Sequence, residues 1–278
     1  MIEIKYYYYS LKEDLNQMLF KQNIQGKDHR YRNILNSPVR NDYEKLYKKY
    51  RPYLDRDFPQ QLADNTESRL WELYLIDTLN KENKKFGKHV SKGPDFSVLN
   101  KDGGRIWFEA VAPEKGEKFK NIRSPSSDQV ILRILSVIED KYDKYQKYVK
   151  EGIVKPDEPY ILAINAKKLE RPDYPDELSE IYKAVMVKGE VGKENTKIKT
   201  GIFFDKYYEG ISAIIYLDYY YIALPDDISN RLQVIYNLCL AKNKIKRGWL
   251  KSGVDITHNG CRYSQLNRLK LNTGRFTR

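Results

Sequence analysis

Residues 93–113, with the sequence GPDFSVLNKDGGRIWFEAVAP, constrain the fold more than any other part of the chain. Two apolar segments flank Asp102-Gly103-Gly104, a combination that predicts a β-hairpin. One acidic residue accompanies each strand: Asp95 lies at the start of the first, and Glu109 lies in the middle of the second. A carboxylate in a buried strand is costly unless a cation, a hydrogen-bond partner or a proton neutralises it.

The second strand of this hairpin is apolar on both faces. Its alternating side chains place Trp107, Glu109 and Val111 on one face and Ile106, Phe108 and Ala110 on the other. Such a strand is central in its sheet and covered on each side, so Glu109 is expected to be buried with Asp95 beside it. Two converging carboxylates repel unless a divalent cation or a shared proton intervenes. Mg²⁺ fits, because it needs only one or two protein carboxylates.

Amphipathic segments predict one helix before the hairpin and another after it. In the first, over residues 66–79, Asn65 or Thr66 can cap the N-terminus, and Glu67 falls in the first turn, where the helix dipole favours an anion. The second covers residues 127–150 and starts at a serine cap. Apolar residues at helical spacing give both helices a face for the core.

The remaining apolar runs predict an α/β (α+β) fold, with a mixed central sheet flanked by helices. Further strands are expected over residues 160–166, 202–204 and 211–217, with a possible continuation over 219–223, and further helices over 41–50 and 227–240. We divide the chain into an N-terminal helical arm (1–60), a core domain (61–240) and a basic C-terminal extension (241–278).

The order of these features resembles the core of the PD-(D/E)xK nuclease superfamily, whose fold is restriction-endonuclease-like. The similarity covers about residues 66–166. Pro94-Asp95 stands where the superfamily has its PD, and Glu109-Ala110-Val111 stands where it has its acidic triplet. The triplet departs from the pattern, because Val111 replaces its final lysine.

The resemblance implies a metal-dependent phosphodiester hydrolase, a nuclease, that acts on nucleic acid. Asp95 and Glu109 would hold Mg²⁺ or Mn²⁺, helped by the Ala110 carbonyl and by Glu67 directly or through water. The metal would lower the pKa of a bound water, orient it in line with the scissile bond and offset charge in the transition state. With Lys141, these acids form the expected catalytic set.

Lys141 is the candidate for the missing lysine, because some superfamily members take this cation from the following helix. Lys141 flanks the apolar stripe of that helix and can snorkel toward the carboxylates. Arg133, on a more polar face, is the second candidate, and Lys115 is the third. Structural explanations compete: Lys141 can merely cover apolar area, Arg133 can pair with a surface acid, and either can neutralise a buried Glu109.

The net charge of +12 is concentrated at one end of the chain. Residues 242–278 hold ten Lys or Arg residues and one acid, a net charge of +9. This concentration is typical of a protein that binds nucleic acid, with DNA favoured over RNA. The expected contacts are Arg133, Lys242, Lys244, Lys246, Arg247 and Lys251. A solubilising tail or a biased base composition of the gene explains the same charge equally well.

Two other functions stay open. Without the motif lysine, the chain can be a catalytically inactive nuclease-like scaffold that binds nucleic acid or protein. Alternatively, the N-terminal arm and a tyrosine-rich sheet can bind a protein partner, and a homodimer is compatible with each function. No signal peptide, membrane-spanning run or disulfide framework is evident, so we expect a cytoplasmic protein without membrane contact, with export by a signal-free route left open.

Overall fold

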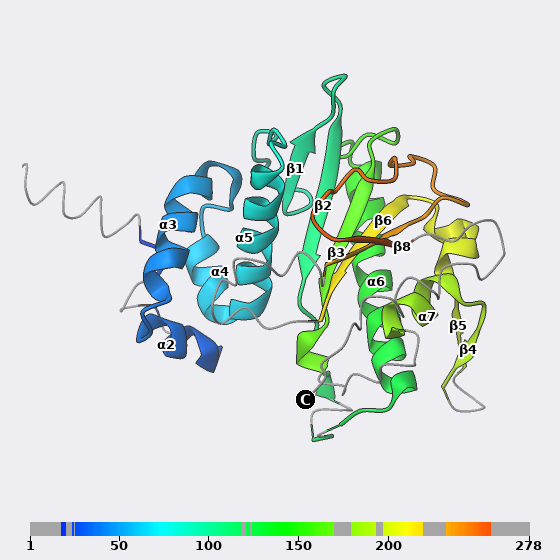
Figure 1. Ribbon diagram of the computed structural model, residues 1–278, viewed down its shortest axis with the longest axis horizontal. Helices are drawn as coiled ribbons and strands as arrows, with labels where there is room; N and C mark the ends of the chain where they lie inside the picture. The colour runs from blue at the N-terminus through cyan, green and yellow to red at the C-terminus, as the bar shows by residue number, and fades with distance from the viewer. Residues whose placement is uncertain are drawn as a thin grey trace, which may run out of the picture.

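The computed structural model describes residues 18–20, 24, 26–117, 121–122, 124–169, 179–192, 197–218 and 232–256. A six-stranded mixed sheet lies between two groups of helices (Figure 1). Its strands are β1 (Phe96–Leu99), β2 (Arg105–Val111), β3 (Tyr160–Asn165), β6 (Ile211–Leu217), β7 (Gln233–Tyr236) and β8 (Val254–Ile256). The helices are α2 (His29–Leu35), α3 (Arg40–Tyr50), α4 (Phe58–Asp64), α5 (Thr66–Lys81), α6 (Ser127–Lys150) and α7 (Glu180–Met186). Short 3₁₀ turns are η1 (Arg51–Tyr53), η3 (Lys167–Leu169), η4 (Ile202–Phe204) and η5 (Lys206–Tyr208), and β4 (Gly189–Val191) pairs with β5 (Ile198–Thr200).

The strand order across the sheet is β1-β2-β3-β6-β7-β8. The three strands β2, β3 and β6 are parallel to one another, while β1 runs antiparallel to β2 and β7 runs antiparallel to β6. The connection from β2 to β3 contains α6, and the connection from β3 to β6 contains α7. The predicted α/β fold with a mixed sheet flanked by helices is therefore confirmed.

Each face of the sheet has its own core. Helix α5 lies against one face, with α2, α3 and α4 packed behind it, and α6 with α7 covers the other (Figure 1). In β2, Ile106, Phe108 and Ala110 pack with the first group, and Trp107 packs with the second. The predicted alternation is thus confirmed, and Glu109 faces the α6 side.

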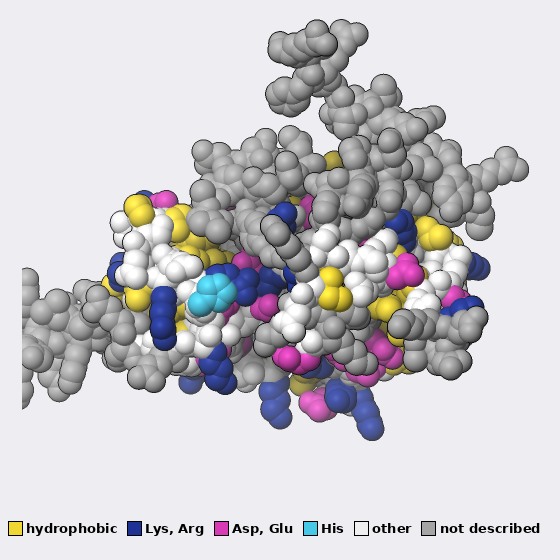
Figure 2. Space-filling view, turned by 90° about the horizontal axis from the view of Figure 1, so that it is seen from below, with side chains coloured by type: hydrophobic (Ala, Val, Ile, Leu, Met, Phe, Trp, Pro, Cys, Tyr) yellow, Lys and Arg dark blue, Asp and Glu magenta, His cyan; other side chains and the backbone are white. Residues whose placement is uncertain are grey.

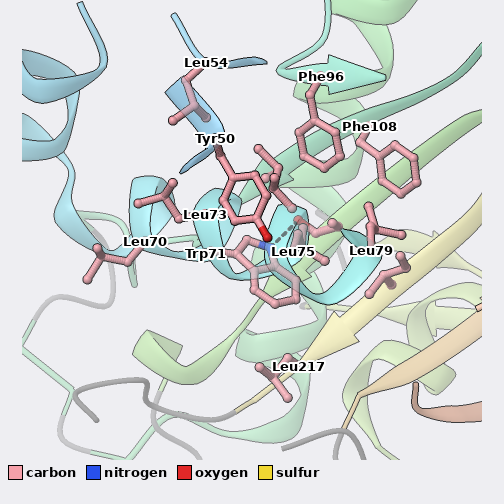
Figure 3. Packing of buried hydrophobic residues seen from close by; sticks show 14 of the residues in the cluster. Tyr50, Leu54, Leu70, Trp71, Leu73, Leu75, Leu79, Phe96, Phe108 and Leu217 are labelled. Carbon is pink, nitrogen blue, oxygen red and sulfur yellow. Dashed lines mark hydrogen bonds between the residues drawn. The ribbon is translucent and has the colours of Figure 1, made fainter. Parts of the chain in front are cut away.

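Trp71 anchors α5 to the middle of the sheet. Its ring is fully buried, and its Nε1 donates to the backbone oxygen of Ala163 in β3 at 2.9 Å. Figure 3 shows this ring among the aliphatic side chains of α5, with Phe96 and Phe108 beside each other on the neighbouring strands. These two phenyl rings stack at 4.9 Å between centroids. Large apolar surface buried in this way holds α5 in a fixed position against the hairpin.

Both helices predicted next to the hairpin are confirmed, with their caps. The Asn65 side chain accepts from the Ser68 amide at 3.4 Å at the start of α5. Ser126 and Gln129 form a reciprocal capping box at the start of α6. Helix α3 likewise covers the segment predicted around residues 41–50.

The strand predicted over residues 202–204 is wrong, because this segment forms the 3₁₀ turn η4. Gly201 before it has a left-handed backbone with φ +74°, and its amide donates to the oxygen of Ala184 in α7. The chain therefore turns toward α7, and Ile202 and Phe203 bury their side chains in the core beneath α6 and α7 instead of joining the sheet.

The helix predicted over residues 227–240 is wrong in its described part. Residues 233–236 form strand β7, which pairs with β6. Their side chains alternate, with Leu232, Val234 and Tyr236 in one core and Ile235 in the other. A short run rich in β-branched residues suits a buried strand as well as a helix, and pairing with β6 decides between them. The first residues of the predicted helix and the continuation over 219–223 lie outside the described residues.

The described parts of the two terminal segments pack onto the core. In the N-terminal segment, Phe20, Tyr31 and Tyr43 are buried in the α5 side of the core. In the C-terminal segment, Ile245 and Leu250 are buried in that same core, and β8 adds a strand to the sheet. Residues 1–17 and 257–278 lie outside the described residues. Among those described, no helix has the length and apolar character needed to cross a membrane.

Candidate active site

Asp95 ties the start of the hairpin to its second strand. One of its carboxylate oxygens, Oδ2, accepts from the amide of Ala110 in β2 at 2.6 Å. The backbone N–H and C=O of one residue in a strand point to the same edge, so the Ala110 carbonyl also points toward the Asp95 side of β2. The other oxygen, Oδ1, accepts from Arg69 of α5 at 3.3 Å.

Glu109 receives a cation from the opposite helix layer. Its side chain is only 6% exposed, and its Oε1 lies 2.5 Å from Nζ of Lys141 in α6. Within the described residues, no hydrogen bond is made to its other oxygen, Oε2. The position of Lys141 on the flank of the α6 stripe therefore brings its ammonium group to the carboxylate. Val111, where the superfamily pattern has lysine, is half-buried against the α6 side of the core.

Arg69 and Glu72 complete this group of charges, which we call the Asp95–Glu109 cluster together with Asp95, Glu109 and Lys141. The two residues lie on one face of α5 at i and i+3, and Arg69 donates to Glu72 at 2.5 Å. The Glu72 side chain is 2% exposed. Arg69 therefore bridges two acids, one from its own helix and one from the hairpin.

The electrostatics of this cluster show an excess of acid. Burial, and next the Asp95 carboxylate, raise the pKa of Glu109 to about 7, although Lys141 and Lys144 act in the opposite direction. Burial lowers the pKa of Lys141, but the Glu109 and Asp95 carboxylates outweigh it and the net pKa is raised. Burial also raises the pKa of Glu72 well above its ordinary value, against the attraction of Arg69. Three acids outnumber two cations here, and because the pKa values of Glu109 and Glu72 are raised, protons offset part of the negative charge. A divalent cation can take the place of those protons.

The donor set fits a small divalent cation. Within the described residues, no group of three or more His, Cys, Asp or Glu side chains is arranged to hold a metal ion. Mg²⁺ needs fewer protein ligands, because it binds through one or two carboxylates and keeps several waters. Asp95 and Glu109 supply two hard oxygen donors, and the carbonyl of Ala110, the residue after Glu109, lies on the Asp95 side of β2.

Glu67 lies in a different group of charges. Burial raises the pKa of Glu67, and the nearby cations Lys168 and Arg30 act in the opposite direction. The acids Asp28 and Glu114 also lie near its carboxylate and raise the pKa further. The physical reason is helix geometry: at ~100° per residue, Glu67 is turned by roughly 200° from Arg69, which contacts Asp95. Glu67 was predicted to assist Asp95 and Glu109, but it lies on the face of α5 turned away from the hairpin. Glu72 is the acid on the face of α5 that points toward the hairpin.

The two other cation candidates also lie away from the carboxylates. Arg133 donates through Nε to the backbone oxygen of Glu114 at 2.7 Å. Lys115 donates to the backbone oxygen of Ile122 at 3.0 Å. Neither residue is among the charges that act most strongly on the pKa of Glu109. Lys141 is the candidate that pairs with Glu109 in the described part of the chain.

The basic C-terminal segment lies beside the start of β3. Asn243 donates to the backbone oxygens of Pro156 and Glu158, which precede that strand. The five cations predicted to contact nucleic acid in this segment are all exposed: Lys242, Lys244, Lys246, Arg247 and Lys251. Their side chains are therefore free to meet a ligand in solution, whereas Arg133 is half-buried against the loop after β2.

Sequence reasoning missed Arg69 and Glu72, although a signal for them was present. The surrounding residues of α5 are apolar on almost every side, including Leu70, Trp71 and Leu73. A charged residue in a helix that is apolar all round is buried and needs a partner. The i, i+3 spacing of Arg69 and Glu72 identifies that partner within the helix.

Comparison of the chain with protein-family models, with curated proteins and with solved structures yields no match. Its function is therefore inferred from the charges and distances of this cluster.

Proposed function

We propose that the protein is a metal-dependent phosphodiester hydrolase that cleaves nucleic acid, with a restriction-endonuclease-like core around α5, β1, β2, α6 and β3. The observation that carries the proposal is the contact of Lys141 with Glu109. Lys141 supplies from α6 the positive charge that β2 lacks, because Val111 stands where the superfamily pattern has lysine. A carboxylate pair can hold the metal that activates water, and a lysine beside it can stabilise the charge that develops during phosphodiester hydrolysis.

Asp95 and Glu109, with the Ala110 carbonyl, would hold Mg²⁺ or Mn²⁺. When bound, the cation lowers the pKa of a water molecule and offsets charge at the reacting phosphate. Arg69 keeps Asp95 in place through Oδ1, and the Ala110 amide keeps it in place through Oδ2. The carboxylate is thus oriented before any ligand arrives, which reduces the cost of binding.

Lys141 acts as a fixed positive charge and not as a general base. Its net raised pKa keeps the ammonium group protonated at neutral pH. From its position at Glu109 it can donate hydrogen bonds to the attacking water or to a non-bridging phosphate oxygen. The exposed cations of the C-terminal segment would bind the phosphate backbone of the substrate, which we propose to be DNA.

A second function is favoured by the pairing within the same cluster. Asp95 and Glu109 already have Arg69 and Lys141 as partners, so the buried acids are partly stabilised without a metal. This arrangement suits a nuclease-like scaffold that binds nucleic acid or protein without cleaving it. The two functions differ in one measurable property, which is hydrolysis that depends on a divalent cation.

The test uses the full chain with Mg²⁺ or Mn²⁺ on supercoiled plasmid, single-stranded DNA and single-stranded RNA, with a chelator as the blank. The variants are Asp95→Asn, Glu109→Gln and Lys141→Met, with the exposed Lys147→Met of the same helix as the matched control. Cleavage lost in the three variants and kept in the control supports the nuclease. Cleavage that persists in Asp95→Asn and Glu109→Gln rejects the site, and binding without any cleavage by the wild type supports the scaffold.

A further inference from the structure

A second group of charges lies where β2 and β3 end, and we call it the Glu114 cluster. Its members are Arg30 of α2, Glu67 in the first turn of α5, Glu114 after β2, and Lys168 in η3 after β3. Oε1 of Glu114 accepts from Nζ of Lys168 at 2.5 Å and from Nη2 of Arg30 at 3.2 Å. Two cations from distant parts of the chain therefore meet on a single carboxylate oxygen. On the face of the molecule seen in Figure 2, Lys and Arg side chains similarly lie next to Asp and Glu side chains.

The cations and the carboxylate differ in how firmly the fold holds them. The Lys168 side chain is 3% exposed, whereas the Glu114 side chain is 61% exposed. A buried ammonium group is costly unless an anion accompanies it. Lys168 is thus fixed by burial, and Arg30, whose side chain is 26% exposed, is held by Asp28 at 3.0 Å, while Glu114 reaches both cations from an exposed loop. Such a carboxylate can leave when another anion enters.

Glu67 gives the site an acceptor that lacks a donor. Its side chain is 8% exposed, and its Oε2 lies 3.8 Å from Nη1 of Arg30. Its Oε1 is buried and accepts no hydrogen bond in the described chain. A buried oxygen without a donor costs free energy, and a ligand that donates to it would recover that cost. The ligand should therefore carry several acceptor oxygens and one O–H group.

We propose that Arg30, Lys168 and Glu67 bind a phosphate group that keeps one proton, and that Glu114 occupies this site until the phosphate displaces it. The phosphate oxygens would accept from Arg30 and Lys168 in charge-assisted hydrogen bonds. Its remaining P–OH would donate to Glu67. Sulfate has no such proton at neutral pH and would meet the Glu67 carboxylate as a like charge.

Two sources carry this chemistry, which are free inorganic phosphate and a phosphate monoester at the end of a nucleic acid. An internal phosphodiester has no P–OH and is excluded for the same reason. The site uses none of the residues assigned to hydrolysis, so it does not depend on the proposed nuclease activity. The variant Asp95→Asn should bind phosphate as the wild type does.

The test is calorimetric titration of the full chain with sodium phosphate and with sodium sulfate at equal ionic strength. Glu114→Gln removes the competing carboxylate and should bind phosphate about tenfold tighter than the wild type, a change of ~1.4 kcal/mol. Lys168→Met should abolish the binding, and the exposed Glu151→Gln should leave it unchanged. Glu67→Gln offers an amide donor and should raise the affinity for sulfate, which keeps the test decisive if Lys168→Met does not fold.

The outcome that overturns the proposal is a Glu114→Gln variant that binds neither anion, or binds phosphate and sulfate equally. The source is settled with oligonucleotides that carry either a 5′-phosphate or a 5′-hydroxyl group, near pH 6, where a monoester still holds a proton in part of the population. A 5′-phosphate advantage that disappears in Lys168→Met identifies a nucleic-acid end. Equal binding of both oligonucleotides, beside binding of free phosphate, identifies the inorganic ion.

Discussion

The Asp95–Glu109 cluster and the Glu114 cluster use the same kinds of side chain, but only the second has an acid that burial does not hold in place. In the first, three acids surround Arg69 and Lys141, and all members are largely buried. In the second, Arg30 and Lys168 meet on Glu114, whose side chain is mostly exposed. In the first cluster, three acids against two cations favour a further cation. In the second, displacement of the exposed Glu114 would leave Arg30 and Lys168 without that carboxylate, which favours another anion in its place. Burial and balance, and not residue type, therefore decide which ligand a charged group can take.

The largest difference between the clusters should appear when one partner of a buried pair is removed. Lys141→Met leaves Glu109 buried without its cation and should lower the free energy of unfolding by about 3 kcal/mol, because such losses run from roughly 3 to 5 kcal/mol. The lower value is expected since Glu109 can take up a proton. Urea denaturation of the variant measures this change.

The double variant Glu109→Leu/Lys141→Met removes both charges and should recover most of the lost stability. The exposed Lys147→Met provides the baseline for a lysine of the same helix. A double variant as unstable as Lys141→Met alone would show that the lysine stabilises the protein through packing and not through Glu109.

The pH dependence of stability should be the next largest effect. The pKa of Glu109 is about 7 in the folded protein, above its ordinary value of 4.5. The folded state then holds more protons than the unfolded state between these values, so the free energy of unfolding should fall as the pH rises from about 4.5 to 7, by at most about 3 kcal/mol. Chemical denaturation across this range tests the sign.

Glu109→Gln should flatten that pH profile, and the remaining slope belongs to Glu72 and Glu67, whose pKa values are also raised. Glu114→Gln should change the profile less than Glu109→Gln does, because Glu114 acts on it only by raising the pKa of Glu67. A stability that rises with pH over this range, or a slope that is undiminished in Glu109→Gln, would contradict the acid excess of the first cluster.

A smaller effect is expected from breaking the ion pairs of the Glu114 cluster. Glu114→Gln should change the free energy of unfolding by no more than about 1 kcal/mol, because the carboxylate is exposed and the amide oxygen still accepts from Lys168. Thermal unfolding at low and at high salt checks this expectation. A loss of stability comparable with that of Lys141→Met would show that the contacts of Glu114 with Arg30 and Lys168 hold α2, η3 and the loop after β2 together.

The smallest effect on stability should come from the exposed basic segment. Replacement of its five cations by glutamine should change the free energy of unfolding within about 0.5 kcal/mol per residue. The same change should weaken DNA binding and reduce its dependence on salt, by up to roughly 0.9 in logarithmic slope for each phosphate that the protein no longer neutralises. Binding measured over a salt series tests this, with glutamine at the exposed lysines of α3 as the control: Lys45, Lys48 and Lys49. An unchanged slope would place the DNA-binding residues elsewhere.

The parts of the fold that the sequence predicts well are those with long, regular patterns. Helices α5 and α6 follow from their apolar spacing and caps, and β2 follows from alternating residues after a glycine turn. Short apolar runs predict less. The segments 202–204 and 233–236 have too few residues to show a period, so the turn at Gly201 and the pairing with β6 decide their structures.

The candidate site shows the same division. Asp95 and Glu109 come from one hairpin and are brought together by local structure, and the offset of Lys141 from the α6 stripe points to Glu109. Which acid of α5 faces them depends on how that helix is rotated against the sheet. Glu67 and Glu72 are equally acidic in sequence, and the docking of Trp71 against β3 selects Glu72.

Taken alone, the order of residues determined the hairpin, the two faces of β2, the flanking helices and the burial of an acid between them, because each depends on neighbours within a few positions. Tertiary structure decided the partners of the charges. Arg69 reaches Asp95 across 26 positions, and Lys168 reaches Glu114 across 54. Ion pairs of this kind form only after apolar surfaces have fixed the segments in place, because a charge carries little information about a partner so distant in the chain.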